Sequence, residues 1–131
     1  MVTIQTQKDT VREFCSAWDQ LDTNKIMSLM SEDAVYHNMP LAPLKGQQEI
    51  SSFIGGFLQL ASSCEFKILN LVADEHCVVT ERVDTFGMKD GSTIDALPVV
   101  GIFEFDDNGK ICCWREYWDL QDWVARGGPA L

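Results

Sequence analysis

VVTERVDTF, the stretch at residues 78–86, decides the fold because it combines β-branched residues with two opposite charges at strand spacing. A strand turns alternate side chains to opposite faces, so Arg82 and Asp84 leave the same face. The ends of the stretch are apolar, which indicates that this face is covered. A buried charge is costly unless it is paired and hydrogen-bonded. The stretch therefore predicts a strand with an Arg82–Asp84 pair, and an ordinary ion pair on a solvated face is the alternative.

Further strands are expected around this stretch, because the hydrophobic pattern has a period of two from residue 64 onward. Turn-forming residues separate the strands, and the Asn108-Gly109 pair is a strong hairpin signal. The pattern favours an antiparallel meander. The four expected strands span residues 64–73, 76–87, 93–106 and 110–119.

Helical periodicity dominates the first half of the chain. Asp22 follows the first apolar stripe and is expected to supply the cap of a short second helix. Pro40, Pro43 and Gly46 argue against regular structure between the second and third helices. The expected helices span about residues 8–21, 26–30 and 47–60, with a brief strand at 34–37 and an irregular segment at 38–46.

Helices followed by a meander predict the α+β class, with a curved, mainly antiparallel sheet packed on three N-terminal helices. Residues 1–131 are expected to form a single domain, which is long enough to bury roughly two thirds of its unfolded surface. A curved sheet wrapped on helices leaves a pocket between the two layers. Pockets of that kind bind small molecules.

The charge balance argues against two classes of partner. Lys and Arg number 10 against 20 Asp and Glu, which gives a formal net charge of −10. This acidity repels phosphate backbones and anionic membrane surfaces, so neither nucleic acid nor a membrane is an expected partner. The sequence shows no secretory signal pattern, and no apolar run reaches the ~18 residues of a membrane span.

Cysteine and histidine usage points to a metal-free protein of a reducing compartment. The cysteines lack the C-x-x-C spacing of zinc and redox sites, so free thiols in the cytoplasm are expected. His37 and His76 are not spaced with carboxylates as metal ligands would be, and we expect no metal and no cofactor. His37 also has the wrong strand parity to join the polar residues on either side of it. The cysteines are Cys15, Cys64, Cys77, Cys112 and Cys113.

Polar side chains of matching parity recur on three of the expected strands. Placed on the concave face of the sheet, they would converge on one apolar cavity. The polar set is Tyr36, Asn38, Arg82, Asp84 and Glu116. The apolar residues expected to line the same cavity are Met39, Leu97, Val99, Trp114 and Trp118, although the two tryptophans fit a plain core as well.

This set of residue types suits the addition of water with simultaneous proton donation to a leaving oxygen. Two carboxyl groups whose pKa values are pushed apart can serve as acid and base. An arginine between them can hold both through forked hydrogen bonds, which lysine does not reproduce. A phenol and an amide together can hold one water molecule. Parity alone leaves a solvated ion-pair network open as the alternative.

Three motifs resemble a known family. They are Tyr36-His-Asn38-Met-Pro-Leu-Ala-Pro43, Thr80-Glu-Arg82-Val-Asp84, and Gly101-Ile-Phe103 followed by Gly109-Lys-Ile111 and Trp114-Arg-Glu-Tyr117. In this order and spacing the chain resembles limonene-1,2-epoxide hydrolases over about residues 10–124. The resemblance implies the SnoaL-like cone, a curved mixed sheet on helices that ketosteroid isomerase, scytalone dehydratase and nuclear transport factor 2 share. It also implies a homodimer that needs no cofactor.

The resemblance assigns a role to each polar residue. Tyr36 and Asn38 would hold a water molecule, and Glu116 would deprotonate it. Asp84, protonated, would give its proton to the oxygen of a small apolar epoxide, and Arg82 would bridge the two carboxyl groups. The family pattern has aspartate where this chain has Glu116, which is one methylene longer. Positioning errors near 1 Å can cost on the order of 100-fold in rate, so this departure bears on activity.

Two other functions stay open on the sequence. The first is isomerisation or dehydration of a polycyclic ketone, but steroid isomerases place a general-base aspartate near the position of Asn38, whose amide accepts no proton at neutral pH. Dehydration of the scytalone type requires a His–Asp pair in the pocket, and His37 and His76 are misplaced for it. The second is a non-catalytic small-molecule-binding or protein-interaction domain, in which the charged residues need not converge.

The outer face of the sheet is the expected dimer contact. Val79, Val83 and Ile102 have the parity opposite to the polar set. Left uncovered, they would form an apolar patch on an otherwise acidic protein. A homodimer formed through this face is therefore expected.

Overall fold

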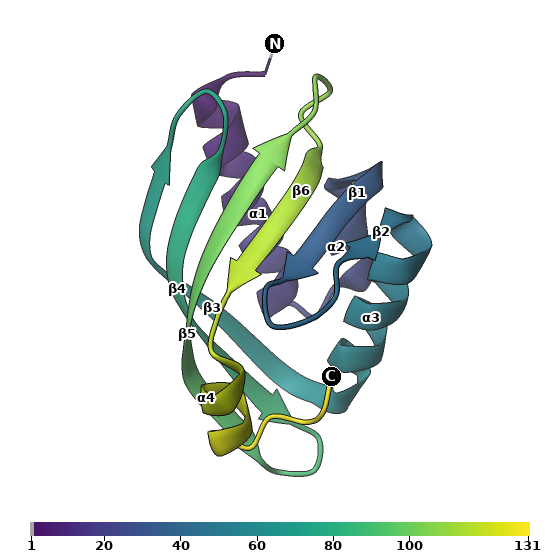
Figure 1. The fold of residues 1–131 in the computed structure, drawn as a ribbon, viewed down its shortest axis with the longest axis vertical. Coiled ribbons are helices and arrows are strands. Elements are labelled where there is room, and N and C mark those ends of the chain that lie inside the picture. The colour runs from purple at the N-terminus through teal and green to yellow at the C-terminus, as the bar shows by residue number, and fades with distance from the viewer. Residues whose placement is uncertain (1) are drawn as a thin grey trace.

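The fold is a curved six-stranded sheet with helices on its concave side (Figure 1). The structure is a computed structural model and describes residues 2–131. The elements are α1 (Ile4–Asp19), α2 (Thr23–Ser28), β1 (Met30–Asn38), β2 (Leu44–Lys45), α3 (Gly46–Leu60), β3 (Ala61–Ala73), β4 (Val78–Met88), β5 (Thr93–Phe105), β6 (Ile111–Tyr117) and α4 (Leu120–Ala125).

The sheet has the order β2-β1-β6-β5-β4-β3 and is open, with β2 and β3 at its edges. β1 runs parallel to β6, and every other pair of neighbouring strands is antiparallel. In Figure 1, α1 lies behind the strands and α3 lies beside β1 and β2. The α+β prediction, with a mixed sheet packed on N-terminal helices, is confirmed.

The first two helices begin at identifiable caps. In α1, Thr3 and Thr6 form a reciprocal capping box, so the helix begins four residues before the predicted Lys8. Asp22 caps α2 as predicted, because its side chain accepts a hydrogen bond from the Lys25 backbone N–H. The buried stripe of α1, which packs on the sheet, comprises Val11, Phe14, Cys15, Ala17 and Trp18.

Four local predictions were wrong. The second helix was predicted at about residues 26–30 but ends at Ser28, and Met30 is the first residue of β1. β1 begins at Met30 instead of residue 34, because Met30 pairs with Ile111 of β6 although residues 30–33 show no alternating pattern. A two-residue strand, β2, lies in the segment expected to be irregular, where Leu44 pairs with Tyr36. The short helix α4 was not predicted, although Asp119 caps it through the Asp122 backbone N–H.

The core centres on Trp114, which is completely buried. Its indole stacks on Tyr36 with the ring centroids 4.1 Å apart and lies edge-on to Phe14 of α1 at 4.8 Å. Trp18 and Phe103 complete the cluster. The expectation that Trp114 lines the cavity is not met, because α1 covers this part of the concave face.

A bulge in β5 sets the inner face of that strand. Ala96 has a positive φ of 51°, and its N–H donates to the Thr85 hydroxyl. The bulge places both Ile94 and Leu97 on the concave face, two residues of opposite parity. Leu97 pairs with Asp84 in register and so stands beside the charged residues.

Candidate active site

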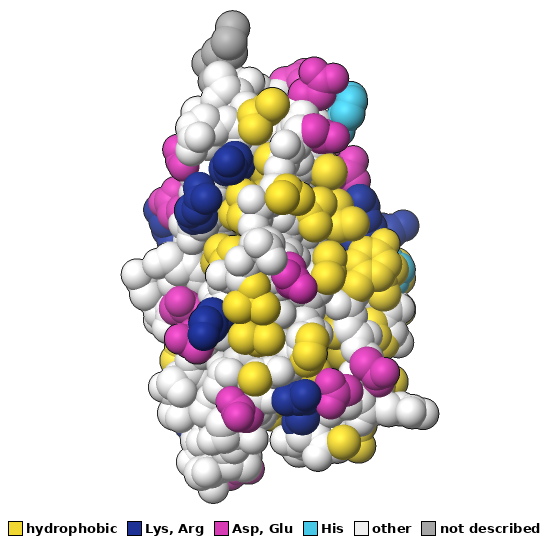
Figure 2. Space-filling model, turned by 90° about the vertical axis from the view of Figure 1, so that its left-hand side faces the viewer, with side chains coloured by type: hydrophobic (Ala, Val, Ile, Leu, Met, Phe, Trp, Pro, Cys, Tyr) yellow, Lys and Arg dark blue, Asp and Glu magenta, His cyan; other side chains and the backbone are white. Residues whose placement is uncertain are grey.

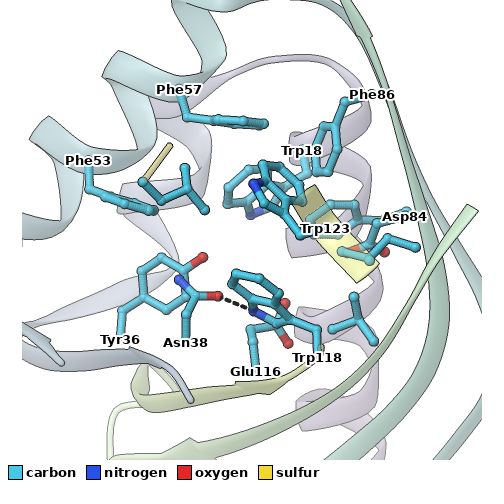
Figure 3. A pocket seen from close by; sticks show the side chains of 14 residues that line it. Trp18, Tyr36, Asn38, Phe53, Phe57, Asp84, Phe86, Glu116, Trp118 and Trp123 are labelled. Carbon is cyan, nitrogen blue, oxygen red and sulfur yellow. Dashed lines mark hydrogen bonds between the residues drawn. The ribbon is translucent and has the colours of Figure 1, made fainter. Parts of the chain in front are cut away.

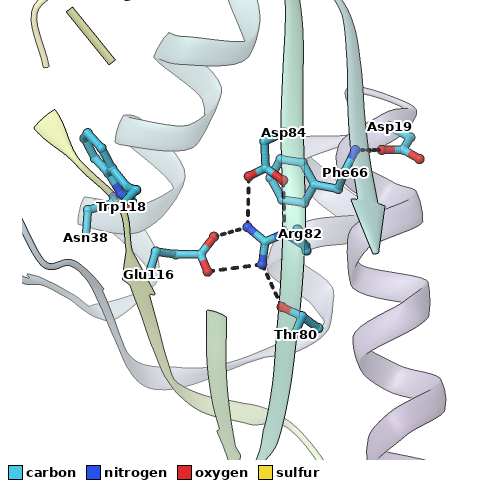
Figure 4. A network of polar contacts seen from close by, with 8 residues as sticks. All are labelled: Asp19, Asn38, Phe66, Thr80, Arg82, Asp84, Glu116 and Trp118. Atoms are coloured by element: carbon cyan, nitrogen blue, oxygen red, sulfur yellow. Dashed lines mark hydrogen bonds and ion pairs between the residues drawn. The ribbon is translucent and has the colours of Figure 1, made fainter. Parts of the chain in front are cut away.

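Arg82 is the centre of a buried polar network that joins β4 to β6 (Figure 4). Its Nε and Nη2 donate to the two oxygens of Asp84 at 3.1 and 2.9 Å. Its Nη2 and Nη1 donate to the two oxygens of Glu116 at 2.5 and 3.2 Å. The last N–H of Nη1 donates to the Thr80 hydroxyl at 3.0 Å. All five guanidinium donors are therefore satisfied inside the protein.

The register of the sheet makes this network possible. Thr80, Arg82 and Asp84 occupy alternate positions on the inner face of β4, whereas Glu116 lies on β6, two strands away. Gly101 of β5 lies directly between, because it pairs with Thr80 on one side and with Glu116 on the other. A Cβ at Gly101 would approach Glu116 Oε2 to 2.4 Å and Arg82 Nη1 to 2.6 Å. Glycine at this position leaves the space through which the ion pair crosses β5.

Burial controls the protonation of the two carboxyl groups. Asp84 and Glu116 are 4% and 3% exposed, and this desolvation raises the pKa of each above its ordinary value, with Arg82 opposing the rise. Each carboxylate also disfavours ionisation of the other. One guanidinium neutralises only one of them, so the network favours one bound proton. The Phe66 ring, whose centroid lies 4.5 Å from Arg82 Cζ, closes one side of the guanidinium.

A cavity of about 60 Å³ lies above this network (Figure 3). Asp84 and Glu116 form its charged side, and aromatic rings form most of the remaining wall. The rings come from α1, α3, α4 and the sheet, so the cavity lies between the two layers of the fold. Its lining residues are Trp18, Tyr36, Asn38, Phe53, Phe57, Phe66, Asp84, Phe86, Leu97, Val99, Glu116, Trp118, Trp123 and Leu131.

Tyr36 and Asn38 reach the cavity from the end of β1, next to Glu116. Asn38 pairs in register with Glu116 on the parallel neighbour β6. Trp118 donates its indole N–H to Asn38 Oδ1 at 2.9 Å. Burial raises the pKa of the Tyr36 phenol above its ordinary value, and Glu116 adds to the rise, so this group stays protonated. The phenol and the amide are thus neutral groups beside a carboxylate.

Most of the residues predicted for the cavity lie at it. Arg82 lies beneath the cavity wall and reaches it only through the carboxyl groups that it holds. Trp114 and Met39 are not part of the lining, because Trp114 is in the core and Met39 lies beyond the last residue of β1. The predicted residues that line the cavity are Tyr36, Asn38, Asp84, Leu97, Val99, Glu116 and Trp118. His37 is half-buried and, outside the lining, contacts the Leu41 carbonyl, as its parity indicates.

The aromatic residues from the helices were missed. Phe53 and Phe57 belong to the apolar face of α3, and Trp123 belongs to α4. Helical spacing marks such residues as buried but does not tell a core contact from a cavity wall. Asp119, four residues before Trp123, was the one signal in the sequence for the helix that carries it.

Two further findings concern the described residues 2–131. They contain no group of three or more His, Cys, Asp or Glu side chains arranged to hold a metal ion. Among them no helix has the length and apolar character needed to cross a membrane.

Substitution of Gly101 tests the crossing of the ion pair over β5. We expect Gly101→Ala to lower the free energy of unfolding by about 1–3 kcal/mol, because the added methyl group displaces buried charges from their partners. Gly56→Ala in α3 is the matched control, since a Cβ there meets nothing within 4 Å. The control should gain roughly 0.5–1 kcal/mol in a urea titration. Equal stability of Gly101→Ala and wild type would contradict this account of the network.

The raised pKa values of the carboxyl pair predict how stability depends on pH. A carboxyl whose pKa is raised by folding stabilises the protein fully below its ordinary pKa, 3.8 for Asp84, and loses that contribution as the pH rises through the higher value. We expect the free energy of unfolding to decrease more steeply above pH 4 in wild type than in Asp84→Asn. Urea titrations at several pH values measure both slopes, and carboxyls elsewhere cancel in the comparison. Parallel slopes would rule out the shared proton.

The comparisons with known proteins agree on a family. Residues 5–126 match the limonene-1,2-epoxide hydrolase catalytic domain. Epoxide hydrolase EphG of Mycobacterium tuberculosis is 31% identical over 124 residues, which cover 92% of this chain and 80% of that protein. The solved structure of an M. tuberculosis LEH-like epoxide hydrolase superposes with a TM-score of 0.81 at 27% identity, covering 94% of this chain and 90% of the other.

Other solved structures share the fold. A SnoaL-like polyketide cyclase fold protein from Shewanella denitrificans has a TM-score of 0.82 at 17% identity, over 92% of this chain and 95% of the other. A protein with a ketosteroid isomerase-like fold from Catenulispora acidiphila has a TM-score of 0.79 at 20% identity, over 92% and 93%. At these identities the likeness concerns the fold alone. With a family match over nearly its whole length and a curated relative above 30% identity, the chain belongs to the limonene-1,2-epoxide hydrolase family.

Proposed function

We propose that this protein hydrolyses a small apolar epoxide to a vicinal diol in one step, without a cofactor. The observation that carries the proposal is that Arg82 holds two buried carboxyl groups at one end of an aromatic cavity. Membership of an epoxide hydrolase family supports it. The same arrangement supplies a base and an acid within one desolvated site.

In the proposed reaction, water bound beside Tyr36 and Asn38 attacks one epoxide carbon. Glu116 takes a proton from this water as the new carbon–oxygen bond forms. The carbon–oxygen bond of the epoxide ring breaks, and Asp84 gives its proton to the departing oxygen. The product is a diol, with one hydroxyl from water and one from the epoxide. Glu116 then carries the proton taken from water and Asp84 is ionised, so one proton passes from Glu116 back to Asp84, directly or through solvent, before the next turnover.

Arg82 has two tasks in this scheme. It keeps one carboxyl ionised as the base, because a full positive charge lies 2.5 Å from Glu116 Oε1. It also contacts both carboxyl groups through Nη2, so the charge stays close to the guanidinium when the proton moves from one carboxyl to the other. The aromatic wall excludes bulk water, which strengthens these interactions.

Tyr36 and Asn38 are the groups that hold the nucleophile in this scheme. Both line the cavity, and both are neutral hydrogen-bonding groups next to Glu116. A general base at the position of Asn38, which an isomerase would require, is absent because the residue is an amide. The site therefore supports hydrolysis better than isomerisation.

We also propose that the outer face of the sheet mediates a homodimer. Val79 pairs with Ile102, and Val100 pairs with Tyr117, so these outer side chains are cross-strand neighbours. Val100 and Tyr117 are 39% and 44% exposed. Figure 2 shows clusters of hydrophobic side chains, interrupted by charged and other side chains, on the side of the molecule where β3 and β4 lie. An exposed apolar face of this kind favours association.

Light scattering tests the dimer directly. At micromolar concentration we expect the wild type to have twice the mass of the chain, and Val100→Glu to shift it toward the monomer by placing a charge in the contact. Glu81→Gln serves as the control, because it changes another exposed residue of the outer face without adding a charge. A wild-type monomer would overturn this proposal without affecting the catalytic one.

Carboxyl variants test the chemistry on a panel of epoxides, with diol formation read by mass. We expect Asp84→Asn and Glu116→Gln each to lower turnover by about 100-fold or more, because each removes a proton-transfer group. Tyr36→Phe should cost about 2- to 10-fold, the effect of one neutral hydrogen bond. Glu116→Asp should retain activity, since it keeps the base and restores the residue of the family pattern.

Unfolding measurements on each variant show whether lost activity reflects lost structure. Glu116→Gln with the rate of wild type would refute water activation by Glu116. A wild type that folds and forms the cavity but converts none of the epoxides would instead favour a binding or isomerase role.

A further inference from the structure

Within residues 2–131, Trp118 is the one aromatic residue of the cavity wall that donates a side-chain hydrogen bond to a proposed water-binding residue. Its indole N–H donates to Asn38 Oδ1, and the two residues are 80 positions apart in the sequence (Figure 3). An indole N–H can only donate, so the amide atom that faces it must be the oxygen. The amide nitrogen of Asn38 must then point away from Trp118. Figure 3 shows it on the side of Tyr36.

We propose that Trp118 is a positioning residue, which locks the Asn38 amide so that its NH₂ group faces the nucleophilic water. This inference rests on the proposed hydrolysis. The inference goes beyond that proposal because it gives Trp118 a role through Asn38, in addition to its place in the apolar wall. Without the indole N–H, the amide is free to turn by 180°, since its two ends have nearly the same shape.

The direction of the amide determines which way the water is held. Water has two protons and two lone pairs. Glu116 is an acceptor and takes one proton, the Tyr36 phenol oxygen accepts a hydrogen bond from the other, and an N–H of Asn38 binds one lone pair. The remaining lone pair is left to attack the epoxide carbon. A turned amide would present its oxygen, which competes with Glu116 for the protons of the water and leaves its lone pairs unoriented.

Trp123 provides an internal comparison. It lines the same cavity, and its ring lies 5.7 Å from that of Trp118, centroid to centroid. Its indole N–H, however, donates to the Pro129 carbonyl and not to a residue of the network. Replacement of either tryptophan by phenylalanine removes similar apolar surface and one N–H. Only the change at Trp118 removes the partner of Asn38.

The kinetic test is a double-mutant cycle on the best epoxide of the panel. We expect Trp118→Phe to lower kcat by about 3- to 10-fold with KM changed less than twofold, because the substrate contacts remain while the water is misplaced. In the Asn38→Ala background, Trp118→Phe should lower kcat no further. Trp123→Phe should act mainly on KM. Its fold-effect on kcat should multiply with that of Asn38→Ala, as independent changes do. The inference would be overturned if the fold-losses in kcat of Trp118→Phe and Asn38→Ala multiplied fully in the double variant.

An independent readout needs no substrate. The chain has four tryptophans, so four indole N–H signals are expected in a ¹H–¹⁵N spectrum and can be assigned with Trp→Phe variants. Asn38→Ala should move the Trp118 signal upfield and speed its exchange with water, and it should leave the Trp123 signal in place. An unchanged Trp118 signal would contradict the hydrogen bond and therefore the inference.

The two readouts separate the inference from the proposed function. A wild type that turns over no epoxide contradicts the proposed function and, with it, the role of Trp118 in placing a nucleophile. Suppose that the wild type turns over an epoxide and that Asn38→Ala moves the Trp118 indole signal, but that the effects of Trp118→Phe and Asn38→Ala on kcat multiply. This result overturns the inference and leaves the proposed function intact. Turnover, a coupled signal and a non-multiplicative cycle together support both.

Discussion

A guanidinium enclosed by protein must find a partner for each of its five N–H groups, and this requirement shapes the middle of the sheet. Arg82 meets it with two carboxyl groups and the Thr80 hydroxyl. Each N–H left unpaired would cost about 1–3 kcal/mol. The alternation of β4 supplies two of the partners, and the third must come from another strand. One buried charge thus determines residues on three adjacent strands, including a glycine that makes no polar contact through a side chain.

The distance from β4 to β6 across β5 explains what a glutamate at position 116 contributes. Neighbouring strands lie about 4.8 Å apart, so the network must span roughly 10 Å between β4 and β6. Only two side chains cover that span, and both oxygens of Glu116 end on Arg82, over Gly101. The additional methylene is therefore used toward Arg82, along the sheet. In the proposed reaction, the base is thereby held by the same group that holds the acid, and an aspartate would leave more of the span to Arg82.

Strand parity predicted which side chains converge. It failed where a helix covers the strand and beyond the end of a strand. Trp114 has the same parity as Glu116, yet it lies in the core because α1 crosses that part of the sheet. Parity does not indicate where along a strand a helix will cover it. Met39 follows the end of β1, where alternation no longer applies. The wall residues Phe57 and Trp123 come from helices whose placement depends on tertiary packing, and α4 is too short to show a period. Local geometry thus favoured the polar site, with a solvated ion-pair network as the alternative, whereas it did not predict the shape of the cavity.

The aromatic wall and the ion network depend on each other. Desolvation by rings such as Phe66 and Phe86 raises the pKa of Asp84, and the proton that the pair retains removes the excess negative charge that the apolar wall would otherwise exclude. In the proposed reaction, an apolar epoxide displaces water from the cavity and deepens this desolvation, which holds the proton on Asp84 until the epoxide oxygen becomes the stronger acceptor. A charged substrate would bring its own hydration and weaken the effect. In the proposed reaction, the rings that select an apolar substrate would therefore also keep the acid ready to react, so substrate binding and acid strength would be two results of one desolvated surface.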